Sequence, residues 1–235
     1  MLFLAVIGEG FVAINMTFKN TAGPIKHQAV AVRNGADLSA FYSCSFEGYQ
    51  DTLYAHSMRQ FYRECDIYGT VDFIFGNTAV VFQKCNIYSR LPMQTQRNTI
   101  TAQGRTDMNQ NTGTTIQDCK ILPAPDLLAG NGSIKTYLGR PWKQYSTTVI
   151  MQSYIDGLID PAGWFPWSGD FALNTLYYAE FNNSGPGSDT SKRVTWVGFN
   201  VINSTTAVDY TVSSLLLGGS SWLSETGVTY STGLI

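Results

Sequence analysis

Charged residues are scarce in this chain, and several kinds of functional motif are missing from it. Only 14% of the 235 residues are charged, and the formal net charge is −2. This balance argues against nucleic-acid binding, which requires basic patches. No apolar run reaches the about 18 residues of a membrane span, and the cysteines form no Cys-x-x-Cys pair of the kind that binds zinc. We therefore expect no nucleic acid, membrane or metal among its partners.

What the chain has instead is an internal repeat of about 20 residues. Cysteines at positions 44, 65, 85 and 119 each stand in a similar strand-like segment. After the first two cysteines, glycines follow at the same offset (Gly48, Gly69), and so do aspartates (Asp51, Asp72). β-Branched and aromatic residues alternate with polar ones, as in strands. Short strands repeating at this period predict an all-β solenoid, a parallel β-helix, that forms one domain over residues 1–235.

Two segments are expected to depart from the regular coils. Residues 1–7 resemble a signal sequence but lack its basic region and cleavage site, so we interpret them as a strand. Because a solenoid normally begins with a polar or helical cap, we expect the chain to be truncated at its N-terminus. Residues 206–217 are predicted to form a short helix that packs on the solenoid.

The cysteines should lie one above another if the repeat register holds. Equivalent positions on neighbouring coils are about 4.8 Å apart, which permits a disulfide between neighbours but not across two coils. The pairing that uses all four joins Cys44 to Cys65 and Cys85 to Cys119. A ladder of reduced, buried thiols is the alternative. Asn-x-Ser/Thr triplets favour a secreted glycoprotein. They begin at Asn15, Asn131, Asn182 and Asn203.

The same register places Asp51 and Asp72 on adjacent coils with their side chains on one face, roughly 5 Å apart. Two like charges at that distance resist ionising together, so one carboxyl tends to keep a proton while the other is a carboxylate. This division provides an acid and a base in one site. A repeat gains no stability from stacked charges, and we therefore interpret the pair as functional.

Other residues fall close to this pair. Gln50 precedes Asp51, and Gln28 lies one long coil earlier, so two stacked amides could donate hydrogen bonds to an oxyanion. A structural glutamine ladder explains that spacing equally well. Arg140 could hold a carboxylate ionised through a bidentate contact, and Trp142 offers a flat face to a sugar ring.

Four further polar residues receive weaker predictions. We expect His27 and His56 to have structural or surface roles, because His27 points away from its neighbour in a strand and His56 falls in a connecting loop. Arg97 and Gln103 are expected at the edge of the cleft.

Several of these segments together resemble the signature stretches of plant pectin methylesterases. They are residues 48–54, 69–76 and 138–142, with 27–31, 163–164 and 177–181 in support. The resemblance extends from residue 3 to residue 235. It implies a right-handed parallel β-helix. It also implies an enzyme that hydrolyses methyl esters of cell-wall homogalacturonan to pectate and methanol, without metal or cofactor.

Residue by residue, the resemblance implies a role for each candidate. Asp72 is the nucleophile that forms an acyl-enzyme anhydride. Asp51 is the general acid that protonates methanol and then the base that activates water. Gln28 and Gln50 stabilise the tetrahedral intermediate, and Arg140 orients Asp72. The aromatic residues implied to line the sugar cleft are Phe75, Trp142 and Trp164.

The resemblance also implies a secreted, cell-wall protein that acts on methylesterified homogalacturonan, with a proteinaceous methylesterase inhibitor as a further partner. We expect a monomer. Two alternatives stay open. A polysaccharide lyase or galacturonan hydrolase could use the same fold, although an inverting hydrolase needs carboxylates about 6.5–9.5 Å apart and a lyase needs acidic calcium ligands. A truncated, inactive wall-binding protein would keep the cleft but release no methanol.

Overall fold

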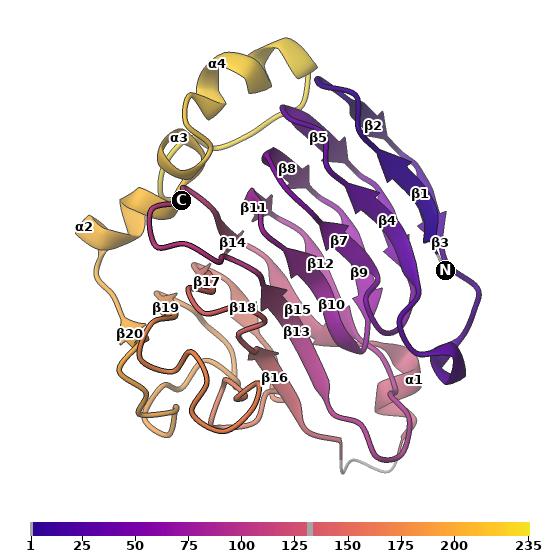
Figure 1. Ribbon diagram of the computed structural model, residues 1–235, viewed down its shortest axis with the longest axis vertical. Coiled ribbons are helices and arrows are strands. Elements are labelled where there is room, and N and C mark those ends of the chain that lie inside the picture. The colour runs from indigo at the N-terminus through magenta and orange to yellow at the C-terminus, as the bar shows by residue number, and fades with distance from the viewer. Residues whose placement is uncertain (1, 131–133) are drawn as a thin grey trace.

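The computed structural model describes residues 2–130 and 134–235, which wind into a stack of coils walled by three parallel sheets (Figure 1). Over most of the chain each turn adds one strand to each sheet in succession, and the last two strands both extend one sheet. Every strand pairs in parallel with its neighbours in the same sheet. The predicted parallel β-helix is confirmed.

The candidate catalytic residues lie in the strands of sheet A or just beside them. The strands of sheet A, in order across the sheet, are β1 (Leu2–Val6), β4 (Val30–Asn34), β7 (Leu53–Ala55), β10 (Val71–Gly76), β13 (Asn98–Gln103) and β16 (Thr136–Gly139).

Sheets B and C close the coil. Sheet B contains β2 (Val12–Ile14), β5 (Ser39–Tyr42), β8 (Arg59–Arg63), β11 (Ala79–Gln83), β14 (Gly113–Gln117), β17 (Thr147–Met151), β19 (Tyr177–Phe181) and β20 (Phe199–Val201). Sheet C contains β3 (Thr17–Lys19), β6 (Ser45–Glu47), β9 (Asp66–Gly69), β12 (Asn86–Ser89), β15 (Lys120–Pro123) and β18 (Tyr154–Ile155).

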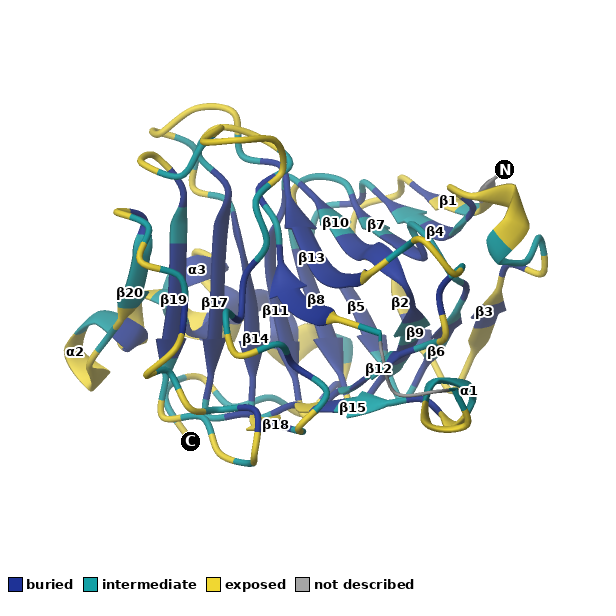
Figure 2. Ribbon diagram, turned by 90° about the horizontal axis from the view of Figure 1, so that it is seen from below, coloured by how far each residue is buried: buried dark blue, intermediate teal, exposed yellow. Residues whose placement is uncertain are grey.

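The core is a set of side-chain stacks that run along the coils. Phe41, Tyr62 and Phe82 stack in register, with ring centroids 4.9 and 4.7 Å apart. Ile67 and Ile87 continue a second row on sheet C. Burial is greatest in the middle of the stack and lower at its ends, where β3 and α2 (Ser204–Ala207) are largely exposed (Figure 2). In-register stacking explains why the repeat keeps one residue type at one position.

The corner between sheets B and C is a single residue in the left-handed conformation, with φ between 49° and 55° in every coil that has it. These corner residues are Asn15, Ser43, Glu64, Lys84, Asp118, Gln152 and Asn182. One left-handed residue turns the chain sharply, so the residue that follows points into the core. In four coils that following residue is cysteine.

The cysteines form the ladder of reduced thiols, and the predicted disulfides Cys44–Cys65 and Cys85–Cys119 are not formed. Each thiol is buried and donates to a backbone carbonyl of the preceding coil, as Cys65 does to Phe41 at 3.4 Å. In-register neighbours keep their Cβ atoms near the strand spacing of about 4.8 Å, whereas a disulfide needs about 3.8 Å. The in-register stacking of the strands therefore opposes the disulfides that the sequence spacing of the cysteines permitted.

The C-terminal region is helical, but the single helix predicted over residues 206–217 is wrong. The chain forms α2, η2 (Val208–Tyr210) and α3 (Val212–Leu215), and the extended backbone of Thr211 separates the last two. Beyond them lie α4 (Gly219–Leu223) and η3 (Ser224–Thr226); η1 (Pro24–Lys26) and α1 (Pro125–Leu128) lie in connections between strands.

Helices α3 and α4 cover the outer face of sheet B beside β8 and β11 (Figure 1). Leu215, Leu216 and Leu223 are buried there against Phe61 and Val81. No helix among the described residues is long and apolar enough to cross a membrane.

Candidate active site

The two aspartates occupy equivalent positions at the start of neighbouring strands of sheet A. Leu53 pairs with Ile74, which places Asp51 beside Asp72 as the repeat predicted. Both have left-handed backbones, with φ of 64° for Asp51 and 52° for Asp72. The same conformation turns the chain at the corners between sheets B and C, so here too a single left-handed residue bends the backbone.

A β-bulge at Asp72 sets the direction of its carboxylate. Val71 pairs with Thr99 and Ile74 with Thr101, so Asp72 and Phe73 together face one residue of β13. The extra residue bends the strand and re-aims its side chains. A Cβ on Gly69 would lie 2.1 Å from the Cβ of Phe73, so this bulge requires glycine four residues earlier.

Asp72 is 6% exposed and is held by two residues from later coils. Arg140 donates from Nε to Oδ1 at 2.8 Å and from Nη2 to Oδ2 at 2.7 Å, the bidentate contact that the sequence predicted. The hydroxyl of Thr99 donates to Oδ1 at 2.6 Å and accepts from the Asp72 N–H at 3.0 Å. Charge-assisted hydrogen bonds of this kind are shorter and stronger than those between neutral groups.

Asp51 has the opposite electrostatic environment. Desolvation by burial raises its pKa to about 7, with a further upward contribution from the charge of Asp72 and an opposing one from Arg140. The site therefore places a carboxyl group held by an arginine beside a carboxyl group whose raised pKa leaves it partly protonated near neutral pH. This is the division of roles that an acid and a nucleophile require.

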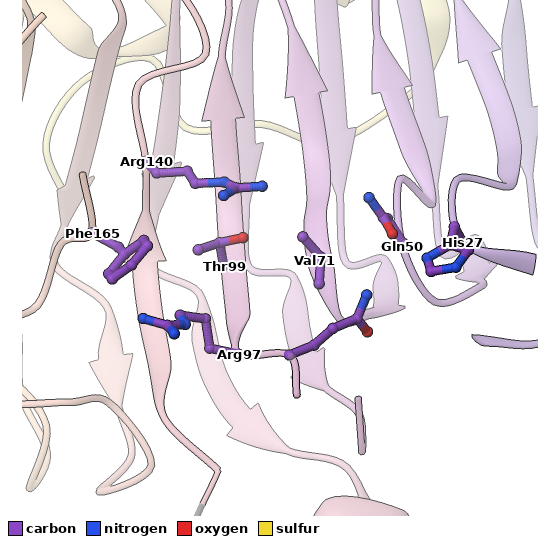
Figure 3. A pocket seen from close by; sticks show the side chains of 8 residues that line it. His27, Gln50, Val71, Arg97, Thr99, Arg140 and Phe165 are labelled. Carbon is purple, nitrogen blue, oxygen red and sulfur yellow. The ribbon is translucent and has the colours of Figure 1, made fainter. Parts of the chain in front are cut away.

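Two adjoining hollows open around the pair. One, of about 130 Å³, is lined by both aspartates and by Gln28, Phe75, Ala102, Trp142 and Trp167. The other, of about 440 Å³, is drawn in Figure 3, where Arg140, Thr99, Val71 and Gln50 face the hollow from neighbouring coils. His27, Gln96, Arg97 and Phe165 complete its lining.

Aromatic side chains flank the aspartates. Phe75 stacks on Tyr54 at 4.3 Å, and Trp142 stands nearly perpendicular to Phe75 at 5.9 Å. Trp167 lies with its ring centroid 4.4 Å from the guanidinium carbon of Arg140. Such a cation–π contact restrains the arginine that binds Asp72.

Trp164 was predicted to line the sugar cleft, and this prediction is wrong. Its side chain is 1% exposed and stacks on Tyr178 at 4.2 Å inside the solenoid. The indole N–H donates to Oε1 of Glu180 at 3.2 Å. The aromatic position that reaches the cleft from this segment is Trp167, three residues later.

Of the two residues predicted at the edge of the cleft, one lies there and one does not. Arg97 lines the larger hollow with its guanidinium carbon 4.6 Å from the centroid of Phe165. Gln103 does not reach the cleft, because it is buried and its Oε1 accepts from two backbone N–H groups. His27 is exposed at the rim of the larger hollow, and His56 lines neither hollow.

The family model for pectinesterases matches residues 3–220. The chain belongs to the pectinesterase family. It is 68% identical over 231 residues to the Arabidopsis thaliana protein named probable pectinesterase/pectinesterase inhibitor 7, covering 98% of this chain and 40% of that protein. Pectinesterase 2 of Citrus sinensis is 60% identical over 231 residues, with 98% and 45% covered.

A solved structure agrees with the sequence comparisons. The pectin methylesterase from carrot superposes with a TM-score of 0.96 at 58% identity, covering 98% of this chain and 72% of that one. This chain nevertheless spans less than half the length of the two curated relatives named above, at 40% and 45%.

Proposed function

We propose that this chain hydrolyses methyl esters of homogalacturonan to pectate and methanol. The observation that carries the proposal is that two different carboxyl groups lie side by side. Asp72 accepts two hydrogen bonds from Arg140, and Asp51 has a pKa raised to about 7. Membership of the pectinesterase family and the aromatic side chains around the smaller hollow support the choice of an esterified sugar polymer.

In the proposed reaction Asp72 attacks the ester carbonyl carbon, and the C–O bond to the methoxy group breaks as Asp51 transfers its proton to the leaving oxygen. Methanol departs, and an anhydride joins Asp72 to the uronate. Asp51, now ionised, takes a proton from water, which attacks the anhydride and releases the carboxylate product. Gln28 and Gln50, one in each hollow, are proposed to donate to the oxyanion of the tetrahedral intermediates.

We extend the proposal to location and partners. The chain is proposed to act as a secreted monomer on cell-wall pectin and to bind a proteinaceous pectin methylesterase inhibitor. Three of the glycosylation triplets support secretion because Asn15, Asn182 and Asn203 are exposed; Asn131 lies outside the described residues.

The test is methanol release from highly methylated pectin by the wild type and by Asp72→Asn. We expect the variant to lose release and to keep polymer binding. Asp118→Asn is the matched control, because Asp118 shares the left-handed backbone of Asp72, with φ of 52°, at a corner that lines neither hollow. Asp72→Asn with more than about a tenth of wild-type turnover would contradict the nucleophile, whose removal costs far more than tenfold in covalent catalysis.

A further inference from the structure

We infer that Thr99 is a positioning residue for Asp72, and that its hydroxyl anchors Oδ1 so that Oδ2 is the oxygen that attacks the ester. The inference rests on the proposed function and assigns a task that neither the repeat nor the family match gives to this residue.

Thr99 contacts Asp72 twice through one atom. Its Oγ1 accepts from the Asp72 N–H at 3.0 Å and donates to Oδ1 at 2.6 Å, so one hydroxyl restrains backbone and carboxylate together. The side chain is 1% exposed, and β13 holds it opposite Val71 in the sheet register. A buried hydroxyl on a paired strand has little freedom to move away.

The two oxygens of Asp72 differ in how many bonds they accept. Oδ1 accepts from Thr99 and from Nε of Arg140, which occupies both of its lone pairs. Oδ2 accepts only from Nη2 of Arg140 among the described residues. An attacking oxygen needs an unoccupied lone pair, and Oδ2 has one.

In the preceding coil, Asp51 has a valine at the position where Asp72 has Thr99. There the N–H of Asp51 donates at 3.0 Å to the backbone carbonyl of Val71, the residue that pairs with Thr99. Valine has no hydroxyl to offer, so it cannot make to Asp51 the bond that Thr99 makes to Oδ1 of Asp72. The change from valine to threonine at this ladder position therefore adds to Arg140 in distinguishing the environment of Asp72 from that of Asp51.

Attack by Oδ2 leaves Oδ1 bonded to Thr99 throughout the acylation step. Oδ2 forms the new bond to the ester carbon, the bond from that carbon to the methoxy oxygen breaks, and the proton of Asp51 goes to methanol. Oδ1 becomes the carbonyl oxygen of the anhydride and continues to accept from Thr99. The threonine proton never leaves its hydroxyl.

The experiment compares kcat and KM for methanol release by the wild type, Thr99→Val, Thr99→Ala and Thr99→Ser. Loss of the hydroxyl is expected to lower kcat by about 10- to 100-fold at unchanged KM, since small misplacement of a reacting group costs this much. Serine keeps the hydroxyl and should return kcat to within about threefold of wild type. Thr115→Val is the matched control, because Thr115 is a buried strand threonine whose hydroxyl has no partner within the described structure.

Two results would overturn the inference while the wild type is active. One is a wild-type kcat in folded Thr99→Val or Thr99→Ala, and the other is a loss in Thr99→Ser as large as that in Thr99→Val. A folded wild type that releases no methanol would instead overturn the proposed function and the inference with it, so the two failures are distinguishable.

Discussion

Asp51 and Asp72 occupy equivalent positions on neighbouring strands, but within the described part of the chain only Asp72 of the two forms an ion pair with an arginine. The backbone treats the two residues alike, since both have left-handed conformations. Side chains from later coils then separate them, because Arg140 and Thr99 bond to Asp72 while burial and the charge of Asp72 raise the pKa of Asp51. The repeat thus places two carboxyl groups side by side. Thr99 and Arg140, from later coils, then give them different environments.

Asp51→Asn is expected to stabilise the fold at pH 8 but not at pH 4. The folded-state pKa of Asp51 is about 7 against an ordinary value of 3.8, so the folded state holds its proton over a range where the unfolded state has lost it. The free energy of unfolding therefore decreases as pH rises from about 4 to about 7, by at most about 4 kcal/mol from this group. Asparagine does not ionise and escapes this loss.

Urea unfolding of both proteins at the two pH values measures the effect, with Asp118→Asn as the control for the substitution itself. A difference between wild type and Asp51→Asn that is the same at pH 4 and pH 8 would show that the pKa of Asp51 is not raised.

Arg97 is expected to favour pectin that already carries free carboxylates. Its guanidinium lies over Phe165 in the larger hollow and belongs to none of the ion pairs among the described residues. A uronate carboxylate beside the reacting ester could pair with it. Arg97→Gln should raise KM for partly de-esterified oligomers by up to about fivefold, because an exposed ion pair contributes at most about 1 kcal/mol. KM for fully methylated oligomers should stay unchanged.

Lys120→Gln is the control for Arg97→Gln, because it removes one exposed positive charge on sheet C. Equal effects of Arg97→Gln on both substrates would mean that Arg97 does not recognise the carboxylate.

Much of this architecture could be predicted because the same physical demand recurs in each coil. The one-residue left-handed corner makes the next residue point inward. In four coils that residue is cysteine, and the first three cysteines are 21 and 20 residues apart. The placement of Asp51 beside Asp72 follows from the same register. The positions of residues in regular coils could therefore be predicted from their spacing in the sequence alone.

The remaining parts depend on coils with insertions or on side-chain packing. Thr99 follows a loop that breaks the 20-residue period, so its pairing with Val71 could be found only by carrying the register across that loop. Trp164 and Trp167 lie in one segment, and only packing decides that the first enters the core and the second reaches Arg140.

Glu180→Gln is expected to destabilise the protein strongly. Glu180 and Arg193 form a bidentate pair with both side chains 2% exposed, and Nε to Oε1 is 2.8 Å. Removing one partner of a buried pair leaves the other charge uncompensated and costs about 3–5 kcal/mol. For a chain of this length the melting temperature should fall by about 6–20 °C.

Differential scanning calorimetry measures this shift. Glu47→Gln is the matched control, since the Lys19–Glu47 pair has side chains 57% and 29% exposed and should contribute less than about 1 kcal/mol. A Glu180→Gln protein that melts with the Glu47→Gln control would mean that Arg193 finds another partner.

The cysteine ladder predicts that all four thiols are free and unreactive in the native protein. Each is buried, and burial raises the pKa of the Cys65 and Cys85 thiols, which keeps the reactive thiolate from forming. Iodoacetamide without a reducing agent should add nothing to the folded protein within minutes and four groups in guanidinium, counted by intact mass. Two groups or none in guanidinium would reveal one or two disulfides, and the in-register stacking of thiols against backbone carbonyls would then be wrong at those coils.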